Sequence, residues 1–159
     1  MTLTRSAERI LSWRSQLHRL ERWYARLAPT ESSSDIERLD FYLAYFMNCY
    51  ALRDWFIKSG AVSMREIDEM IGANESMRLC RDVCNRSKHL TLREPSIDGH
   101  FQIFREYDHY ENTSRWVIFV LGVKRDLFDV ASSCMTFWTH FLESYRPQNP
   151  PDPFANANN

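Results

Sequence analysis

The chain has 159 residues, of which 44% are hydrophobic and 14% aromatic, and its formal net charge at pH 7 is −1. A chain of this length buries on the order of two thirds of its unfolded surface, so folding requires neither a metal nor a disulfide. The near-zero net charge excludes a global basic field for nucleic acid, but it leaves room for a local basic patch.

The N-terminal half predicts four helices. Apolar residues recur at three- and four-residue spacing over residues 6–27, which predicts the first helix. The second helix begins at Asp35, which can cap it, and is apolar on nearly all faces over residues 41–57, which is typical of a helix at the centre of its domain. Buried polar groups need partners, so three polar interruptions are expected to face a polar seam or a neighbouring helix: Asn48, Arg53 and Asp54.

Two shorter helices follow in this half. Ser63 and Glu66 form a capping box that predicts a short third helix ending at Gly72. Asn74 can cap a fourth helix that runs from Glu75 to about His89.

After residue 90 the hydrophobic period changes from helical to alternating. The alternation over residues 101–106 and 116–121, with a turn-like segment between them, predicts a two-stranded hairpin at about residues 100–122. Asp126 can cap a last helix that reaches about residue 145. We therefore predict a mainly α protein, a single helical domain over residues 1–146 with about five helices and an inserted two-stranded β-hairpin. A disordered tail is predicted over residues 147–159 because its Pro-, Asn- and Ala-rich composition cannot fill a core.

The cysteines favour a reducing compartment. None of the four forms a CxxC pair and each lies in an apolar helical context, which predicts buried free thiols: Cys49, Cys80, Cys84 and Cys134. The N-terminus has no apolar signal-peptide region, and charges interrupt every apolar run short of a membrane span, so we expect a cytoplasmic protein without membrane contact. No cofactor or metal is expected, because the only imaginable ligand set has no recognised spacing: His89, His100, His109 and Asp108.

The fourth helix has a one-sided polar face. With about 100° between successive residues, five side chains fall within a sector of about 100°: Arg78, Arg81, Asp82, Asn85 and His89. An ordinary solvated face with an Arg78–Asp82 pair is the simplest interpretation. Two features favour a functional one. Asn is a poor helix former in mid-helix, and the negative end of the helix dipole favours a protonated His89 beside Lys88.

The functional interpretation assigns chemical roles to this face. His89 would act as a general acid or contact a phosphate, with Asn85 beside it. Arg81 or Arg78 would hold a phosphate and stabilise developing negative charge. The catalytic candidates are therefore His89, Asn85 and Arg81, and the substrate-binding candidates are Arg78, Lys88 and Asp82. Such a set could cleave RNA without a metal ion, with the 2′-hydroxyl of the substrate as nucleophile.

Long helices with an Asn-x-x-x-His element near a helix end, here Asn85 and His89, resemble the HEPN superfamily. The resemblance covers about residues 35–90 and implies a small helical bundle, commonly dimeric, with metal-independent ribonuclease activity in toxin–antitoxin, phage-defence or RNA-processing systems. In that family an Arg precedes the motif's polar residue, and here Cys84 occupies its position. The Asp-x-x-Asn-x-x-Lys-His pattern that ends at His89, together with Asp54-Trp55, also resembles a group of uncharacterised bacterial and phage proteins.

Three hypotheses follow. The first is a HEPN-like homodimer whose fourth helices form a shared RNA cleft, cleaving RNA only if Arg81 replaces the missing Arg. The second is a non-catalytic interaction module that binds a cognate protein as a partner or inhibitor subunit. The third is purely structural: Asn85 and His89 would be buried and bonded to Asn48, Arg53 or Asp54, so the burial of His89 decides between it and the other two.

Overall fold

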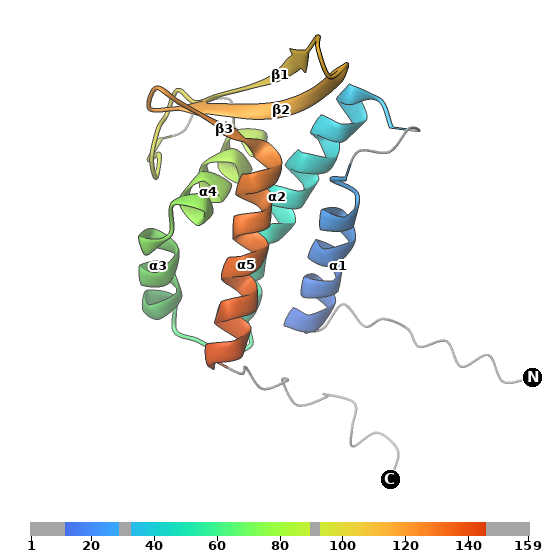
Figure 1. Cartoon of the computed structure of the whole chain (residues 1–159). Coiled ribbons are helices and arrows are strands. Elements are labelled where there is room, and N and C mark those ends of the chain that lie inside the picture. The colour runs from blue at the N-terminus through green and yellow to red at the C-terminus, as the bar shows by residue number, and fades with distance from the viewer. Residues whose placement is uncertain (1–11, 29–32, 90–92, 146–159) are drawn as a thin grey trace, which may run out of the picture.

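The computed structural model describes residues 12–28, 33–89 and 93–145. Five helices and a three-stranded sheet follow in chain order: α1 (Trp13–Ala25), α2 (Asp35–Lys58), α3 (Met64–Ala73), α4 (Glu75–Lys88), β1 (Gln102–Asp108), β2 (Thr113–Val120), β3 (Val123–Asp126) and α5 (Leu127–Tyr145). The protein is mainly α with a small β element, as predicted, and the sheet lies across one end of the helices (Figure 1). The predicted tail and the predicted first turns of α1 lie outside the described residues.

Helix α2 packs against α1, α4 and α5. Its apolar side chains point in all directions, so they are buried only when helices surround it; its buried members are Tyr42, Tyr45, Phe46, Cys49, Leu52 and Phe56. The Phe56 ring lies 5.2 Å from Trp13 of α1, and 5.5 Å and 4.7 Å from Trp138 and Phe141 of α5. Even so, no helix in the described ranges is both long and apolar enough to span a bilayer.

Side-chain caps fix where three of the helices begin. Ser63 and Glu66 form the predicted capping box of α3, and Asn74 caps α4 by accepting from the Met77 N–H at 2.9 Å. The cap of α2 is Ser34 rather than the predicted Asp35, because the Ser34 hydroxyl accepts from the N–H of Glu37. Asp35 is the first residue of α2 and binds the sheet instead.

The predicted hairpin is present as β1 and β2, which pair antiparallel from Gln102↔Phe119 to Asp108↔Thr113. A third strand, β3, was not predicted. It pairs antiparallel with β2, from Val120↔Val123 to Val117↔Asp126, and gives the order β1-β2-β3. Leu121 and Gly122 form the tight turn between β2 and β3 with positive φ angles of 47° and 77°. A two-residue hairpin turn of this kind needs positive φ, and leucine is rarely found there, so the turn gave no sequence signal.

Polar contacts attach the sheet to the helices. Asp35 forms an ion pair with Arg105 of β1 and accepts from the Ser114 hydroxyl of β2 at 3.0 Å, while its backbone carbonyl accepts from the Trp116 indole at 3.1 Å. The hydrogen bond from Ser114, followed by the contacts with Arg105, lowers the pKa of Asp35.

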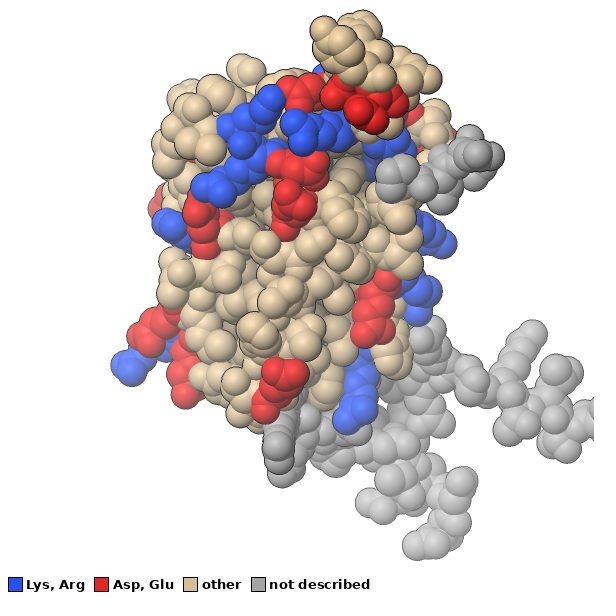
Figure 2. Space-filling view, viewed as in Figure 1, with Lys and Arg blue, Asp and Glu red and all other residues tan. Residues whose placement is uncertain are grey.

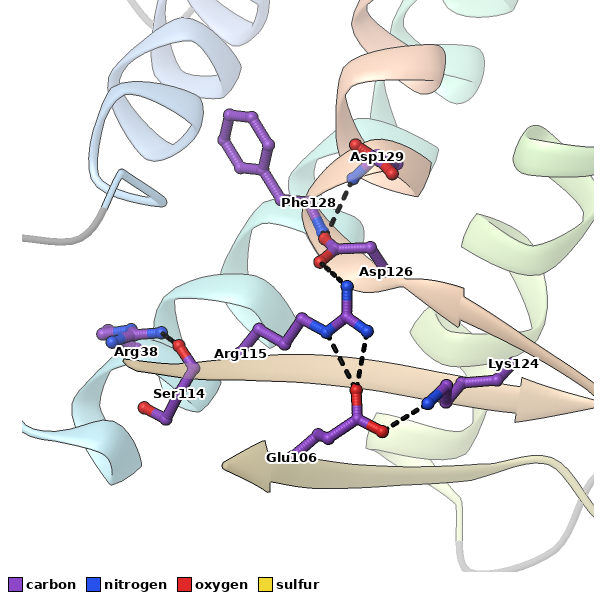
Figure 3. A network of polar contacts seen from close by, with 8 residues as sticks. All are labelled: Arg38, Glu106, Ser114, Arg115, Lys124, Asp126, Phe128 and Asp129. Carbon is purple, nitrogen blue, oxygen red and sulfur yellow. Dashed lines mark hydrogen bonds and ion pairs between the residues drawn. The ribbon is translucent and has the colours of Figure 1, made fainter. Parts of the chain in front are cut away.

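A second network crosses the other face of the sheet (Figure 3). Glu106 of β1 accepts hydrogen bonds from Lys124 of β3 and Arg115 of β2, and these bonds lower its pKa. Arg115 also lies 3.8 Å from Asp126, whose carboxylate accepts from the Phe128 N–H and so caps α5. The network therefore joins all three strands to the start of the last helix.

Candidate functional site

The candidate site lies on the outward face of α4. One side of the helix is buried against its neighbours through Met77, Leu79, Cys80, Asp82, Val83 and Cys84. The opposite side has five polar residues, which we call the α4 stripe: Arg78, Arg81, Asn85, Lys88 and His89. The first three are half-buried, and Lys88 and His89 are exposed. The polar face predicted by helical projection is therefore present, except for Asp82.

His89 lies at the end of α4, where the helix stops. Its backbone is extended, with φ −132° and ψ 137°, and its N–H donates to the Asn85 carbonyl at 2.9 Å. Its side chain is exposed. The purely structural hypothesis, which required a buried His89, is therefore wrong for this residue.

Asp82 corrects the predicted face. Its side chain is only 1% exposed, and its two carboxylate oxygens accept from the backbone N–H groups of Ser96 at 2.7 Å and Ile97 at 2.9 Å. The expected pair with Arg78 is absent among the described residues, and Asp82 does not lie on the solvent side where it could touch a substrate. It holds the segment that leads into β1 against α4.

The three residues predicted to support the site make their contacts elsewhere. Asn48 accepts from the Gln16 amide of α1 at 3.2 Å and donates to its own helix. Arg53 binds Asp68 of α3 through two hydrogen bonds of 2.5 and 2.7 Å, and it also binds Asp54 at 2.6 Å. Asn48 and Arg53 thus face neighbouring helices, as expected. Within the described ranges no hydrogen bond joins any of the three to the α4 stripe.

The cations of the stripe form no ion pair within the described part of the chain, although Arg81 lies near enough to Asp68 of α3, which binds Arg53, to contribute to the lowered pKa of that carboxylate. The two acidic residues of α4 are engaged elsewhere: Glu75 pairs with Arg125 at 2.5 Å, and Asp82 binds backbone N–H groups. The Nε atom of Arg78 is buried, and no described residue accepts its hydrogen. The stripe therefore presents positive charge and hydrogen-bond donors that the described residues leave free for an anionic ligand.

Cys84 occupies the position of the arginine in the resembled motif. Its thiol is buried, and burial raises its pKa, with a smaller opposing effect of Lys88. Cys84 therefore cannot replace an exposed cation. Arg81 lies one turn earlier and about 60° around the helix axis, on the outward side, so it is the arginine of α4 placed to act with Asn85 and His89.

The described residues contain one further group with ligand chemistry that was not predicted. The thiols of Cys49, Cys80 and Cys134 lie within 4.8 Å of one another in the core. All four cysteines are buried and free, as predicted. Their convergence could not be read from spacing, because the three come from separate helices and the rotation of each helix is set by packing.

The contact between Asp82 and the backbone of Ser96 and Ile97 predicts a stability effect. Asp82→Ala should lower the free energy of unfolding by roughly 2–4 kcal/mol, because two N–H groups lose their charged acceptor. Urea denaturation measures the change. Asp40→Ala, on the exposed side of α2, is the control and should change stability by less than about 0.5 kcal/mol. Equal effects of the two substitutions would contradict the role of Asp82.

Comparisons with known proteins were made on three levels. Searches of protein-family models, of curated proteins and of solved structures find no match to this chain. The resemblance to the HEPN superfamily therefore remains a hypothesis that rests on Asn85 and His89, and the function has to be argued from the geometry of α4.

Proposed function

We propose that this protein is a HEPN-like RNA-binding protein that contacts RNA through the α4 stripe and acts as a metal-independent endoribonuclease in a toxin–antitoxin or phage-defence system. The main observation in support is that Arg78, Arg81, Asn85 and Lys88 lie on one side of α4 and the exposed His89 follows at its end, while no acidic side chain of the described residues forms an ion pair with these cations. An ordinary solvated helix face contains acids as well as bases, which neutralise one another. Here the acids of α4 point elsewhere.

RNA phosphates suit this face chemically. A guanidinium group can donate two parallel hydrogen bonds to phosphate oxygens, and Lys88 adds a point charge at the rim. Beside the last turn of α4 lies an open apolar groove of about 460 Å³, lined by Phe101, Ile103 and Phe104 and bordered by Arg86. Single-stranded RNA is commonly bound by a cationic surface together with aromatic groups against which bases stack. The groove opens on the side of α4 that carries Val83, Arg86 and Ser87, so a base bound there would lie beside Arg86, across the helix from the α4 stripe.

Cleavage in this proposal requires a homodimer in which two α4 stripes face each other. One His89 imidazole accepts the proton of the ribose 2′-hydroxyl, and the 2′-oxygen attacks the adjacent phosphorus. The bond from phosphorus to the 5′-oxygen breaks, and the protonated His89 of the second copy gives its proton to that leaving oxygen. Arg81 stabilises the negative charge on the phosphate oxygens, and Asn85 orients the phosphate. The dimer supplies the acid and the base that a single stripe lacks.

Arg81→Ala should weaken RNA binding by about five- to tenfold at moderate salt and reduce the salt dependence of the affinity by about one ion, because one phosphate contact is lost. Fluorescence anisotropy with a labelled single-stranded RNA over a salt series measures both quantities. Arg65→Ala on α3 is the matched control, since Arg65 is exposed and pairs with Glu69. If both variants bind like the wild type, the α4 stripe is not the RNA surface.

His89→Ala should reduce cleavage of structured RNA in EDTA by about 10²- to 10⁴-fold, the usual contribution of a general acid or base. Gel analysis of a labelled transcript follows the reaction, and His140→Ala on the exposed side of α5 is the control. Equal cleavage by wild type and His89→Ala, or no cleavage by either, would remove the ribonuclease claim. The binding experiment with Arg81→Ala would then still decide whether the stripe binds RNA.

The second candidate function is a non-catalytic module that binds a protein. Two observations favour it: Cys84 stands where the motif needs arginine, and the outward side of α5 is almost free of charge. Among the 19 residues of α5, Asp129 and Glu143 are the only acidic side chains, and neither lysine nor arginine occurs. Figure 2 shows this surface as a broad uncharged area below the charged band of the sheet. Uncharged surfaces are typical of protein contacts.

Sedimentation velocity distinguishes which helix mediates self-association. In the RNA-binding proposal, Lys88→Glu should affect the dimer, because it changes the face that the two copies share, and Thr136→Arg on α5 should leave it unchanged. The opposite result would place the self-association surface on α5 and contradict the shared α4 cleft, since a charge placed on the uncharged surface disrupts contacts there. Both substitutions lie at exposed positions, so neither should unfold the chain.

A further inference from the structure

Three thiols meet at the centre of the helical bundle. Cys49 comes from α2, Cys80 from α4 and Cys134 from α5, and each side chain is fully buried. Their sulfur atoms all lie within 4.8 Å of one another. No His, Asp or Glu side chain of the described residues joins the group. Three separate helices thus direct one sulfur each to a common point.

Hydrogen bonds around the sulfurs make Cys49 differ from the other two. The Trp138 indole N–H donates to the Cys49 Sγ at 3.3 Å. The Cys80 thiol donates to the Phe46 carbonyl at 3.5 Å, and the Cys134 thiol donates to the Ser76 carbonyl at 3.3 Å. Burial raises the pKa of Cys80 and of Cys134. Cys49 is therefore the sulfur of the group that accepts a hydrogen bond, whereas the other two thiols donate to backbone carbonyls.

We propose that Cys49, Cys80 and Cys134 form a three-coordinate site for a soft monovalent metal ion, Cu(I). With metal–sulfur bonds of about 2.3 Å, three ligands around one ion lie about 4.0 Å apart, so the thiols need to move closer by less than about 1 Å. Thiolate sulfur selects Cu(I) over harder cations. Zinc completes a tetrahedron with four ligands, and the described residues offer three.

Cu(I) binding replaces thiol protons. Each metal–sulfur bond forms as the proton of that thiol leaves to solvent, and the charge of the ion offsets part of the negative charge that this places on sulfur in the apolar core. The indole of Trp138 continues to donate to the sulfur and orients it. Because the site is closed, the ion enters when the helices separate or while the chain folds.

The experiment uses the full-length, fully reduced chain under anaerobic conditions, with Cu(I) supplied from a competing chelator. Cu(I) is added in one arm to the folded protein and in the other to the denatured protein before refolding. We expect one equivalent of Cu(I) per chain in at least one arm, an ultraviolet charge-transfer band, and three sulfur neighbours in X-ray absorption spectra. Cys49→Ser and Cys134→Ser should each lower the Cu(I) affinity at least about tenfold.

Cys84→Ser is the matched control, because Cys84 is also buried on α4 but lies outside the group. It should keep the full equivalent of Cu(I). The proposal is overturned if the wild type takes up no Cu(I) in either arm, if both Cys49→Ser and Cys134→Ser still bind as the wild type does, or if Cys84→Ser alone loses binding. Circular dichroism checks that each variant folds.

If the serine variants do not fold, the X-ray absorption spectrum of the Cu(I)-loaded wild type still tests the proposal. Coordination by two sulfurs, or by nitrogen and oxygen, would overturn the three-thiol site. No RNA takes part in this experiment, so its outcome is independent of the proposed ribonuclease function.

Discussion

The need to cover α2 governs this structure. A helix that is apolar on most of its sides is stable only when most of its length is covered, and α1, α4 and α5 therefore pack around it and leave only positions such as Asp40 and Asp54 exposed. Each of these surrounding helices has only one side left for solvent. For α4 that side presents the row of cations with Asn85 and His89, and for α5 it is the uncharged surface. The two surfaces that we consider for function are thus the sides that remain after the central helix has been buried.

Two aspartates connect the helices to the sheet. Asp35 begins α2 and binds β1 and β2, while Asp82 lies in the middle of α4 and binds the segment that precedes β1. Asp35 does so partly through an ion pair with the half-exposed Arg105, whereas the buried Asp82 is satisfied by two backbone N–H groups. Because Asp82 lies between Arg81 and Asn85 in sequence but on the inner side, the same turn of α4 supports the sheet and displays the stripe. A substitution that shifts this turn would therefore change both the attachment of the sheet and the position of the stripe.

The helices and the first hairpin could be predicted from the sequence because their signals are local. The capping box at Ser63, the period of α2 and the alternation in β1 and β2 all act over a few residues. Three features could not be predicted in this way. The turn before β3 places a leucine at positive φ, the partners of Asp82 lie 14 and 15 residues away, and the three thiols meet only when α2, α4 and α5 are packed. Each of these three features depends on contacts that exist only in the folded chain, and none has a local sequence pattern. Within the candidate site the helical period placed His89 and Asn85 on the outer side correctly and misplaced Asp82, which lies at the margin of that face.

The order of the strands has a consequence for how the protein behaves in a crowded solution. Within the described sheet, β1 and β3 are the outer strands, and each offers unpaired backbone groups along one side. Such edges invite other extended chains to add to the sheet and so to begin aggregation. Charged residues stand along both of them, with Arg105, Glu106 and Asp108 on β1 and Lys124, Arg125 and Asp126 on β3, and β3 has only four residues. The ion pairs that hold the sheet together thus also protect the chain against uncontrolled polymerisation.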